Sequence, residues 1–357
     1  MTDVSPVKGQ RLMTELIAMT SGKDGSSVDQ SKTTYSLKTL SQETLVLATT
    51  IVIFILCAIF IRGFFTLANI STLARTVSVL GILGVGMTVV VIGRGLDLSQ
   101  VAVLAICAAW SLKLIGLGYG LTVGLAMGLG FAIAVGVFNG FAISIIGIPA
   151  LFTTLASGTL VYGIGRWLML NGIITYAPDN QPLLLAIGQG ELFGVPIPLV
   201  IFGVVALVGH FILSRTTAGR FVYAFGDNAE AARLTGVSVR VLTIGQYAFS
   251  SAVAFLAGLV TAGTVASINT NVFSSSLIFD VLLIVVLGGV SLSGGRGSIA
   301  SVLAGTALIG TLLNAMILLD VQGDVQNIVK SVVLLGAITL DRKLHPRDEE
   351  TARQGDL

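Results

Sequence analysis

Charged residues are scarce in this chain. Asp, Glu, Lys and Arg make up 11% of its 357 residues, whereas soluble globular domains carry roughly 25%. Apolar residues make up 54%, and the mean hydropathy is +0.95. A chain of this length with so few charges cannot cover itself with a water-facing surface, so it must face lipid. The formal net charge of +2 gives no electrostatic footprint for a nucleic acid.

Cysteine and histidine are also rare, and their placement excludes several chemistries. Cys57 and Cys107 lie inside apolar runs without metal-ligand spacing, so we interpret both as small buried side chains. His210 and His345 are solitary, and the chain has neither an HExxH motif nor a GxxxxGKS or GxxxxGKT phosphate loop. We therefore expect no metal, no cofactor and no enzymatic activity, and no nucleotide hydrolysis by the P-loop route.

Apolar runs that can cross a bilayer fill most of the sequence. A hydrocarbon core of roughly 30 Å needs about 20 apolar helical residues, and about ten such runs can be counted. The predicted fold class is all-α, a polytopic membrane protein with about ten transmembrane helices, of which the third is a candidate for half-insertion. The predicted segments are 44–61, 76–92, 98–114, 121–145, 151–170, 195–213, 241–265, 277–292, 299–319 and 327–340.

Glycine is abundant in these runs. The chain has 43 glycines, many at four-residue spacing, as in Gly116, Gly120, Gly124 and Gly128, and then in Gly136 and Gly140. In lipid, small residues at this spacing let helix backbones approach closely. Tight helix packing accounts for most of them, although a channel between closely packed helices would use the same device.

Basic residues gather in three polar stretches, and these predict the domain organisation. They are an N-terminal tail over 1–42, which we expect to be mobile, a loop over 214–240 inside a transmembrane domain over 43–341, and a C-terminal tail over 342–357. By the positive-inside rule all three are cytoplasmic, and the even number of predicted crossings between them agrees. Arg62 and Arg75 fall on the predicted outer side and count against the rule.

A short charged helix is predicted within the loop, in the stretch GDNAEAARLTGVSV. Asp227 or Asn228 can cap its start, Glu230 suits its first turn, and Gly236 ends it. A helix of about two turns is too short to span a membrane. Its small face could enter a groove on a soluble partner, with Glu230 and Arg233 at the rim. The alternative is an ordinary amphipathic linker.

This stretch resembles the coupling loop of permease subunits of bacterial ABC sugar importers, the ribose, arabinose and xylose permease family. The residues that match are Gly226, Asn228, Ala231, Ala232 and Gly236, with Asp227 where the family often has glycine. Further resemblances follow in order in LGILGVGMTVVVIGRGLDLS, VFNGFAISIIGIPALFTTLASGTLVYGI, VVLGGVSLSGGRGS and QNIVKSVVLLGAITLD, so that residues 65–344 are covered. Arg94 stands where glycine is usual, and Gln100-Val101 replaces Val-Gly.

The resemblance implies a permease subunit that moves a monosaccharide, a pentose or hexose or possibly a polyol, into the cytoplasm by alternating access. ATP would be hydrolysed on a separate ABC ATPase subunit. The residues implied to contact that subunit are Gly226, Asp227, Asn228, Glu230, Ala231, Ala232, Arg233 and Gly236. The other implied partners are a periplasmic or extracellular sugar-binding protein, a second permease copy in a homodimer, and lipid. The implied location is the bacterial inner membrane, with both termini cytoplasmic.

Polar side chains within the apolar runs are candidates for a substrate path. They are Asp97, Asn139, Thr154, Asp280 and Asn314. An ionisable residue at membrane depth is costly and normally faces a cavity or a partner. Asp97 is interpreted either as a helix cap paired with Arg94 or as a gate residue. Asp280 either contacts sugar hydroxyls or caps its helix with a neighbouring serine, and for the other three residues interhelical hydrogen bonding is the favoured interpretation.

An ion-coupled secondary transporter of a small polar solute is the alternative function. That class usually carries paired carboxylates or unwound half-helices near the membrane midplane. This chain has few acidic residues in its apolar runs, and they lie near the predicted helix ends.

Overall fold

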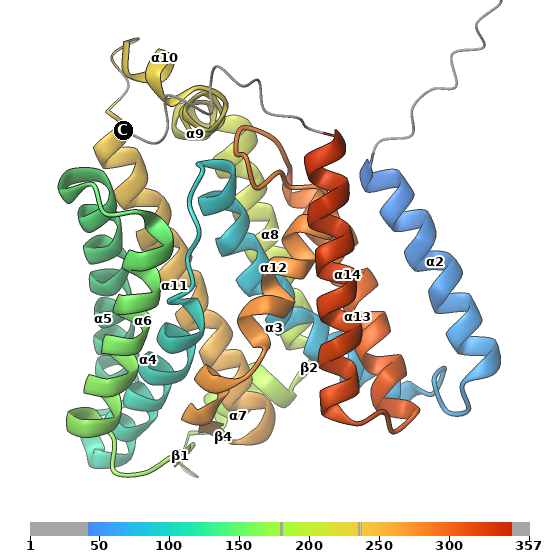
Figure 1. Cartoon of the computed structure of the whole chain (residues 1–357). Helices are drawn as coiled ribbons and strands as arrows, with labels where there is room; N and C mark the ends of the chain where they lie inside the picture. Colours follow the sequence, from blue (N-terminus) through green and yellow to red (C-terminus); the bar gives the residue numbers. More distant parts are fainter. Residues whose placement is uncertain (1–41, 179–180, 235, 237, 345–357) are drawn as a thin grey trace, which may run out of the picture. The chain divides into compact units, whose positions relative to one another are not determined.

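A computed structural model describes residues 42–178, 181–234, 236 and 238–344, and this part of the chain is mostly helical (Figure 1). The predicted tails over 1–42 and 342–357 thus lie outside the described residues, except at 42 and 342–344. The helices are α2 (Gln42–Phe60), α3 (Leu67–Ile92), α4 (Gln100–Leu114), α5 (Leu121–Phe141), α6 (Ala150–Ile164), α7 (Pro182–Gln189), α8 (Ile197–Arg215), α9 (Thr217–Asp227), α10 (Ala229–Leu234), α11 (Val239–Val265), α12 (Leu277–Gly288), α13 (Ile299–Leu318) and α14 (Gly323–Leu344).

Each of the predicted apolar segments overlaps one of these helices. In the described part of the chain, 6 helices are long and apolar enough to cross a membrane, and the apolar stretches Thr44–Phe60 and Leu277–Gly288 are shorter. The prediction of a helical membrane protein is confirmed, and ten as the number of crossings stays a prediction. The helices α7 and α9 were not predicted.

The helix α3 begins at Leu67, well before the predicted start at 76. The Thr66 hydroxyl caps it by accepting a hydrogen bond from the Asn69 backbone N–H at 3.3 Å. Arg75 seemed to interrupt the apolar run, but its guanidinium donates to the carbonyl oxygens of Gly188 at 2.5 Å and Gln189 at 3.0 Å. A cation at the end of α7 satisfies that helix's last carbonyl groups, so Arg75 is accommodated inside α3.

The helix α4 is enclosed by protein. Its sequence, QVAVLAICAAWSLKL, is apolar or small on every side, and nearly all its residues are buried. A helix that is hydrophobic all round belongs in an interior, and α4 packs against α5, α6 and α11. The third predicted segment is therefore a central helix of the bundle.

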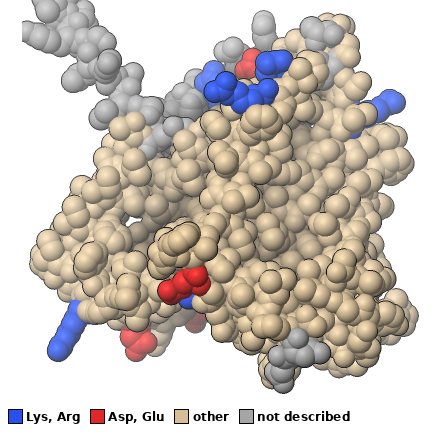
Figure 2. Space-filling view, turned by 180° about the vertical axis from the view of Figure 1, so that it is seen from behind, with Lys and Arg blue, Asp and Glu red and all other residues tan. Residues whose placement is uncertain are grey.

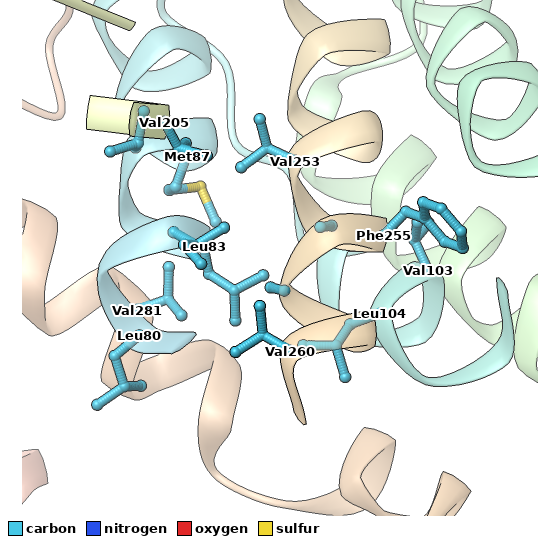
Figure 3. Packing of buried hydrophobic residues seen from close by; sticks show 14 of the residues in the cluster. Leu80, Leu83, Met87, Val103, Leu104, Val205, Val253, Phe255, Val260 and Val281 are labelled. Atoms are coloured by element: carbon cyan, nitrogen blue, oxygen red, sulfur yellow. The ribbon is translucent and has the colours of Figure 1, made fainter. Parts of the chain in front are cut away.

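Small residues allow the helices around α4 to approach one another. Between apolar helices in lipid, close van der Waals contact takes over from the hydrophobic effect as the main attraction. A Cβ atom at Gly136 or Gly140 of α5 would overlap the backbone of α11, and one at Gly258 of α11 would overlap the backbone of α4. Larger apolar side chains fill the space between α3, α4, α8, α11 and α12; Figure 3 labels Leu80, Leu83, Met87, Val103, Leu104, Val205, Val253, Phe255, Val260 and Val281.

The described structure also contains π-helical turns at Ile115–Tyr119, Ala142–Ile146 and Gly165–Met169, a 3-10 helix at Thr270–Ser274, and two short antiparallel strand pairs. The strand β1 (Ile174–Tyr176) pairs with β4 (Ser267–Asn269), and β2 (Glu191–Leu192) pairs with β3 (Val195–Pro196). In Figure 1 these strands lie at the lower ends of the helices, and α9 and α10 lie at the upper ends. The first residues of α2 and the last residues of α14 lie at the upper ends as well.

We expect Gly136→Val to lower the stability of the folded chain by about 1–3 kcal/mol, because the side chain would force α5 away from α11. Gly130→Val is the matched control. It lies on the same helix, and a Cβ added there meets nothing within 4 Å, so both changes alter helix propensity alike and only one creates a clash. Denaturation of the two purified variants in mild detergent measures the difference. Equal stability of the two variants would contradict the close packing of α5 on α11.

Candidate functional site

The short helix predicted in the 214–240 loop is present as α10. The Asn228 side chain caps it, because its Oδ1 accepts a hydrogen bond from the Ala231 backbone N–H at 2.9 Å. Asn228, and not Asp227, is therefore the cap. Glu230 lies in the first turn of the helix, and Gly236 follows it with a φ of +81°. On its surface Ala231 and Arg233 are exposed and Ala232 is buried. The exposed face of α10 therefore carries the small side chain of Ala231, with the charged side chain of Arg233 at its rim.

The helix α9 precedes α10 and fastens it to the rest of the chain. Thr216 caps α9 by accepting a hydrogen bond from the Gly219 N–H at 3.1 Å. Near its other end, the Tyr223 hydroxyl donates to the Gly297 carbonyl at 2.8 Å. Gly226 leaves no room for a side chain, since a Cβ there would overlap the Ile92 carbonyl oxygen and the Gly295 backbone. The last turn of α9 thus lies directly on the end of α3 and on the α12–α13 loop.

Arg94 joins the same three segments. Its Nη2 donates to the Asp227 carbonyl at 3.0 Å, and its Nε donates to the Ser293 carbonyl at 3.2 Å. The backbone N–H of Gly295 donates to the Ile92 carbonyl at 2.8 Å. Arg94 adopts a φ of +63°, which is uncommon for any residue except glycine. We call the segments 92–94, 226–227 and 293–297 the three-segment junction.

The loop of this junction is held in shape by its own sequence. Gly294 and Gly295 both have positive φ angles, as the tandem glycines predict. Ser298 caps α13 in a reciprocal capping box with Ser301.

Asp97 lies at the centre of a buried hydrogen-bond cluster. Its Oδ1 accepts from the Ser99 N–H at 3.1 Å and from the Ser99 hydroxyl at 2.5 Å, and its Oδ2 accepts from the Ser250 hydroxyl at 2.6 Å. Asn139 Nδ2 donates to the Ser99 hydroxyl at 2.9 Å, and Gln100 Nε2 donates to the Ser250 hydroxyl at 2.7 Å. All five side chains are fully buried, so the cluster joins α4, α5 and α11.

The structure does not bear out the interpretation of Asp97 as a helix cap paired with Arg94, because the cap position of α4 is Ser99, which has no side-chain cap hydrogen bond. Asp97 does accept hydrogen bonds at the start of α4, but its partners are Ser99 and Ser250, while Arg94 extends toward Asp227 and Ser293. The positive φ of Arg94 turns the chain between the two residues. Thr154 belongs to the surroundings of this cluster, because its hydroxyl donates to the Leu96 carbonyl at 3.2 Å.

Asp280 forms an ion pair that the sequence analysis missed. The Lys330 Nζ lies 2.9 Å from its Oδ1 and also donates to the Ser276 hydroxyl at 2.7 Å. Each charged side chain is only 11% exposed. Lys330 lies in the predicted apolar segment 327–340, seven positions after the first residue of α14, Gly323, and this position was a signal that it needs a partner.

The side chain of Asn314 bonds to neither the Asp97 cluster nor the pair of Asp280 and Lys330. Its side-chain amide exchanges two hydrogen bonds with that of Asn69, each of 2.9 Å. The five candidates for a substrate path therefore fall into three groups. Asp97, Asn139 and Thr154 lie together, Asp280 lies with Lys330, and Asn314 lies with Asn69. Asn139 and Asn314 form the interhelical hydrogen bonds that were the favoured interpretation.

Charge marks one edge of the molecule. In Figure 2, Lys and Arg side chains gather along the upper edge, the edge at which Figure 1 labels α9 and α10. Most of the surface below is uncharged, with a few charges toward the lower edge. Among the described residues, the exposed arginines of this region are Arg94, Arg215, Arg220, Arg233, Arg240 and Arg296.

The sequence matches, over residues 69–338, the family described as branched-chain amino acid transport system / permease component. The ribose import permease protein of Haemophilus influenzae is 33% identical over 283 residues, which are 79% of this chain and 87% of that protein. The L-arabinose transport system permease protein of Escherichia coli is 36% identical over 293 residues, 82% of this chain and 88% of that protein. The galactofuranose transporter permease protein of Escherichia coli is 32% identical over 255 residues, 71% and 74% respectively. No solved structure matches the chain.

We expect Asp97→Asn and Ser250→Ala to be coupled in their effects on stability, by about 0.5–3 kcal/mol, because the two side chains share a buried hydrogen bond. The coupling between Asp97→Asn and Arg94→Gln should be smaller, because no hydrogen bond joins these residues and Arg94 donates to Asp227 and Ser293 instead. Two double-mutant cycles, measured by denaturation in detergent, test this. Strong coupling of Asp97 to Arg94 would restore the paired interpretation.

Proposed function

Because this chain belongs to the branched-chain amino acid transport system / permease component family, which includes permeases of sugar ABC importers, we propose that it is the membrane subunit of an ATP-driven importer. It moves a monosaccharide into the cytoplasm by alternating access, and a separate ATPase subunit hydrolyses the ATP. The relatives named for ribose, L-arabinose and galactofuranose support a pentose or a hexose as the substrate. A polyol presents the same hydroxyl groups, so it belongs to the proposed class of substrates as well.

One observation carries this proposal: an exposed short helix is firmly fastened to the membrane helices. A helix of 6 residues is too short to be stable by itself in water. The Asn228 cap and the packing of α9 on the three-segment junction hold it in place. A force applied to α10 is therefore transmitted through Asp227 and Arg94 to the end of α3.

We propose that the ATPase subunit docks on this face. The contact residues are Gly226, Asp227, Asn228, Glu230, Ala231, Ala232, Arg233 and Gly236. Their roles differ. Ala231 and Gly236 are exposed and small, so a partner can approach closely there, and Glu230 and Arg233 provide polar contacts at the rim. Gly226 and Ala232 are buried and act by positioning the helix.

The remaining assembly follows from this arrangement. The basic edge that carries α9 and α10 is proposed to be cytoplasmic, in keeping with the positive-inside rule. The first residues of α2 and the last residues of α14 lie at the same edge. This placement supports the proposal that both termini of this multi-pass inner-membrane protein are cytoplasmic. A soluble sugar-binding protein docks on the opposite edge and supplies the specificity. The transmembrane domain over 43–341 provides one side of the substrate path, and the same domain of a second permease copy completes it.

We expect Ala231→Arg to leave membrane insertion intact and to reduce both ATPase co-purification and sugar uptake by at least about tenfold. A bulky charge in the centre of a docking contact commonly costs about 2 kcal/mol or more. The control for ATPase binding is Phe193→Arg, which should leave ATPase co-purification intact, because Phe193 is 98% exposed in the turn between β2 and β3, at the edge opposite α10. Normal uptake by Ala231→Arg would contradict docking on α10. Uptake by the wild type that persists without the ATPase would favour an ion-coupled transporter.

We expect Arg94→Gly to raise the number of ATP molecules hydrolysed per sugar imported by about threefold or more, because it removes two hydrogen bonds that fasten α9. Glycine adopts the positive φ without strain, so folding is preserved. Paired measurements of ATP hydrolysis and uptake in proteoliposomes give this ratio, which a purely structural role would not change. Arg94→Lys, which keeps the charge, should recover part of the coupling. An unchanged ratio in Arg94→Gly would show that the junction transmits no force through Arg94.

A further inference from the structure

The helix α2 stands at the edge of the bundle (Figure 1) and packs chiefly against α13. A groove of about 440 Å³ separates it from the other helices, and its walls come from α2, α3, α8 and α13. The lining includes Leu47, Ile51, Ile55, Leu73, Val77 and Leu199. The first three of these side chains are about half exposed, so the groove is open to the surroundings of the bundle.

The groove offers an occupant no free polar group from its walls. None of its lining residues is charged. Its two hydroxyl groups donate within their own helices, from Thr50 to the Val46 carbonyl at 2.8 Å and from Thr311 to the Ala307 carbonyl at 2.7 Å. Left empty, the walls would lose van der Waals contacts, which are a main attraction between apolar helices in lipid. An apolar occupant would therefore complete the packing of α2.

The groove is too narrow for a helix of another protein. On α2 its lining extends from Leu47 to Ile55, which is about 12 Å of helix. Spread over that length, the volume corresponds to a mean cross-section of roughly 40 Å², whereas a helix about 10 Å in diameter occupies roughly 80 Å². The shape thus fits a thin, unbranched hydrocarbon chain.

A turn that carries Arg62 lies beyond one end of the groove. The last residues of α2, about 8 Å of helix after Ile55, lead into this turn. Phe54 of the groove wall packs edge-to-face on Phe64 and Phe65 of the same turn, with ring centres 5.2 Å and 6.4 Å apart. The turn is thus fastened to the wall of the groove, at the edge opposite α9 and α10 (Figure 1).

Arg62 is an exposed cation at the end of an apolar helix. In the described part of the chain, the ion pairs join Arg75 to Glu191 and Lys330 to Asp280, so no described acidic group lies within 4 Å of Arg62. Long basic side chains near the ends of membrane helices extend into the headgroup layer. A guanidinium binds phosphate there through two parallel hydrogen bonds, and a phosphate would supply the missing anion.

We propose that the groove holds an acyl chain of a phospholipid whose phosphate is bound by Arg62. From the turn that carries Arg62 to Leu47 is about 20 Å, which matches one leaflet with its headgroup region, roughly 20–22 Å. The bound lipid fills the space between α2 and α3 and holds α2 against the bundle. This inference goes beyond the proposed function, and only the assignment to the leaflet facing away from the cytoplasm rests on it.

Filling the groove with protein tests the position of the acyl chain. Ala74 and Ala68 both lie on α3, but Ala74 lines the groove and Ala68 is exposed outside it. The chain is reconstituted in nanodiscs of phosphatidylglycerol and transferred to mild detergent, and native mass spectrometry counts the phospholipid that each chain retains. We expect the wild type and Ala68→Trp to retain a phospholipid, and its occupancy in Ala74→Trp to fall by about tenfold or more.

The same spectra identify the other possible occupants. Equal retention by Ala74→Trp and Ala68→Trp would mean that the lipid is adventitious only. A change in the number of protein copies in Ala74→Trp, with no change in bound lipid, would mean that the groove is an interface between copies of this chain. Either result would overturn the proposal.

Replacing the cation tests the headgroup contact without touching the packing of the helices. Arg62 lies in an exposed turn, so Arg62→Gln should fold, and Arg62→Lys is the matched control that keeps the charge. We expect lipid occupancy to fall by about tenfold in Arg62→Gln, because a charge-assisted hydrogen bond is lost, and to stay near the wild-type value in Arg62→Lys. Equal occupancy in Arg62→Gln and the wild type would overturn the assignment.

Thermal unfolding of the delipidated chain separates a lipid from a free anion. Added phosphatidylglycerol should raise the Tm of the wild type more than that of Arg62→Gln, and inorganic phosphate should leave both unchanged. Stabilisation by inorganic phosphate alone would indicate an anion site without an acyl chain and would overturn the proposal. None of these measurements uses ATPase binding or sugar import, so their outcome does not depend on the proposed function.

Discussion

Helices surrounded by lipid gain little from hiding apolar side chains, so this bundle depends on how closely its backbones can approach. The absence of side chains at Gly136 and Gly140 lets α5 lie on α11, and Gly258 lets α11 lie on α4. The same constraint applies at the basic edge, where Gly226 brings α9 onto the end of α3. Helix positions are therefore set by contact between main chains, and a helix that moves must carry its neighbours with it.

The short stretch between α3 and α4 connects two networks of polar contacts. Arg94 fastens it to Asp227 and to the α12–α13 loop, and three residues later Asp97 fastens it to Ser99 and Ser250. The first network is exposed and carries the proposed docking helix, while the second is buried among α4, α5 and α11. A displacement of α10 can thus reach the centre of the bundle through the hydrogen bonds of Arg94, the backbone from Arg94 to Asp97, and the hydrogen bonds of Asp97. We regard this route as the physical basis of the proposed energy coupling.

The sequence predicted the features that depend on local pattern. Apolar runs identified the helices, glycine spacing identified the close contacts, and the Asn228 cap and Gly236 defined α10. It missed the start of α3, because Arg75 counts as a break in hydropathy but is accommodated by carbonyl groups of α7, which lies far away in the sequence. The partners of Asp97 and Asp280 could not be predicted, because Ser250 and Lys330 are brought to them only by tertiary packing. Long-range hydrogen bonds between single polar residues leave no periodic signal in one sequence.

The bond between Asp97 and Ser250 also sets a schedule for biogenesis. The two residues are 153 positions apart, so at a synthesis rate of 5–20 residues per second Asp97 emerges roughly 10–30 s before its partner. During that interval Ser99 is the first acquired of the two hydroxyl partners, Asn139 follows with α5, and α11 arrives last. Until α11 is made, the carboxylate at the start of α4 therefore has Ser99 but lacks Ser250 as a hydrogen-bond donor. Enclosure of that carboxylate is complete once α11 packs against α4 and α5, while α12, α13 and α14 have still to join the bundle.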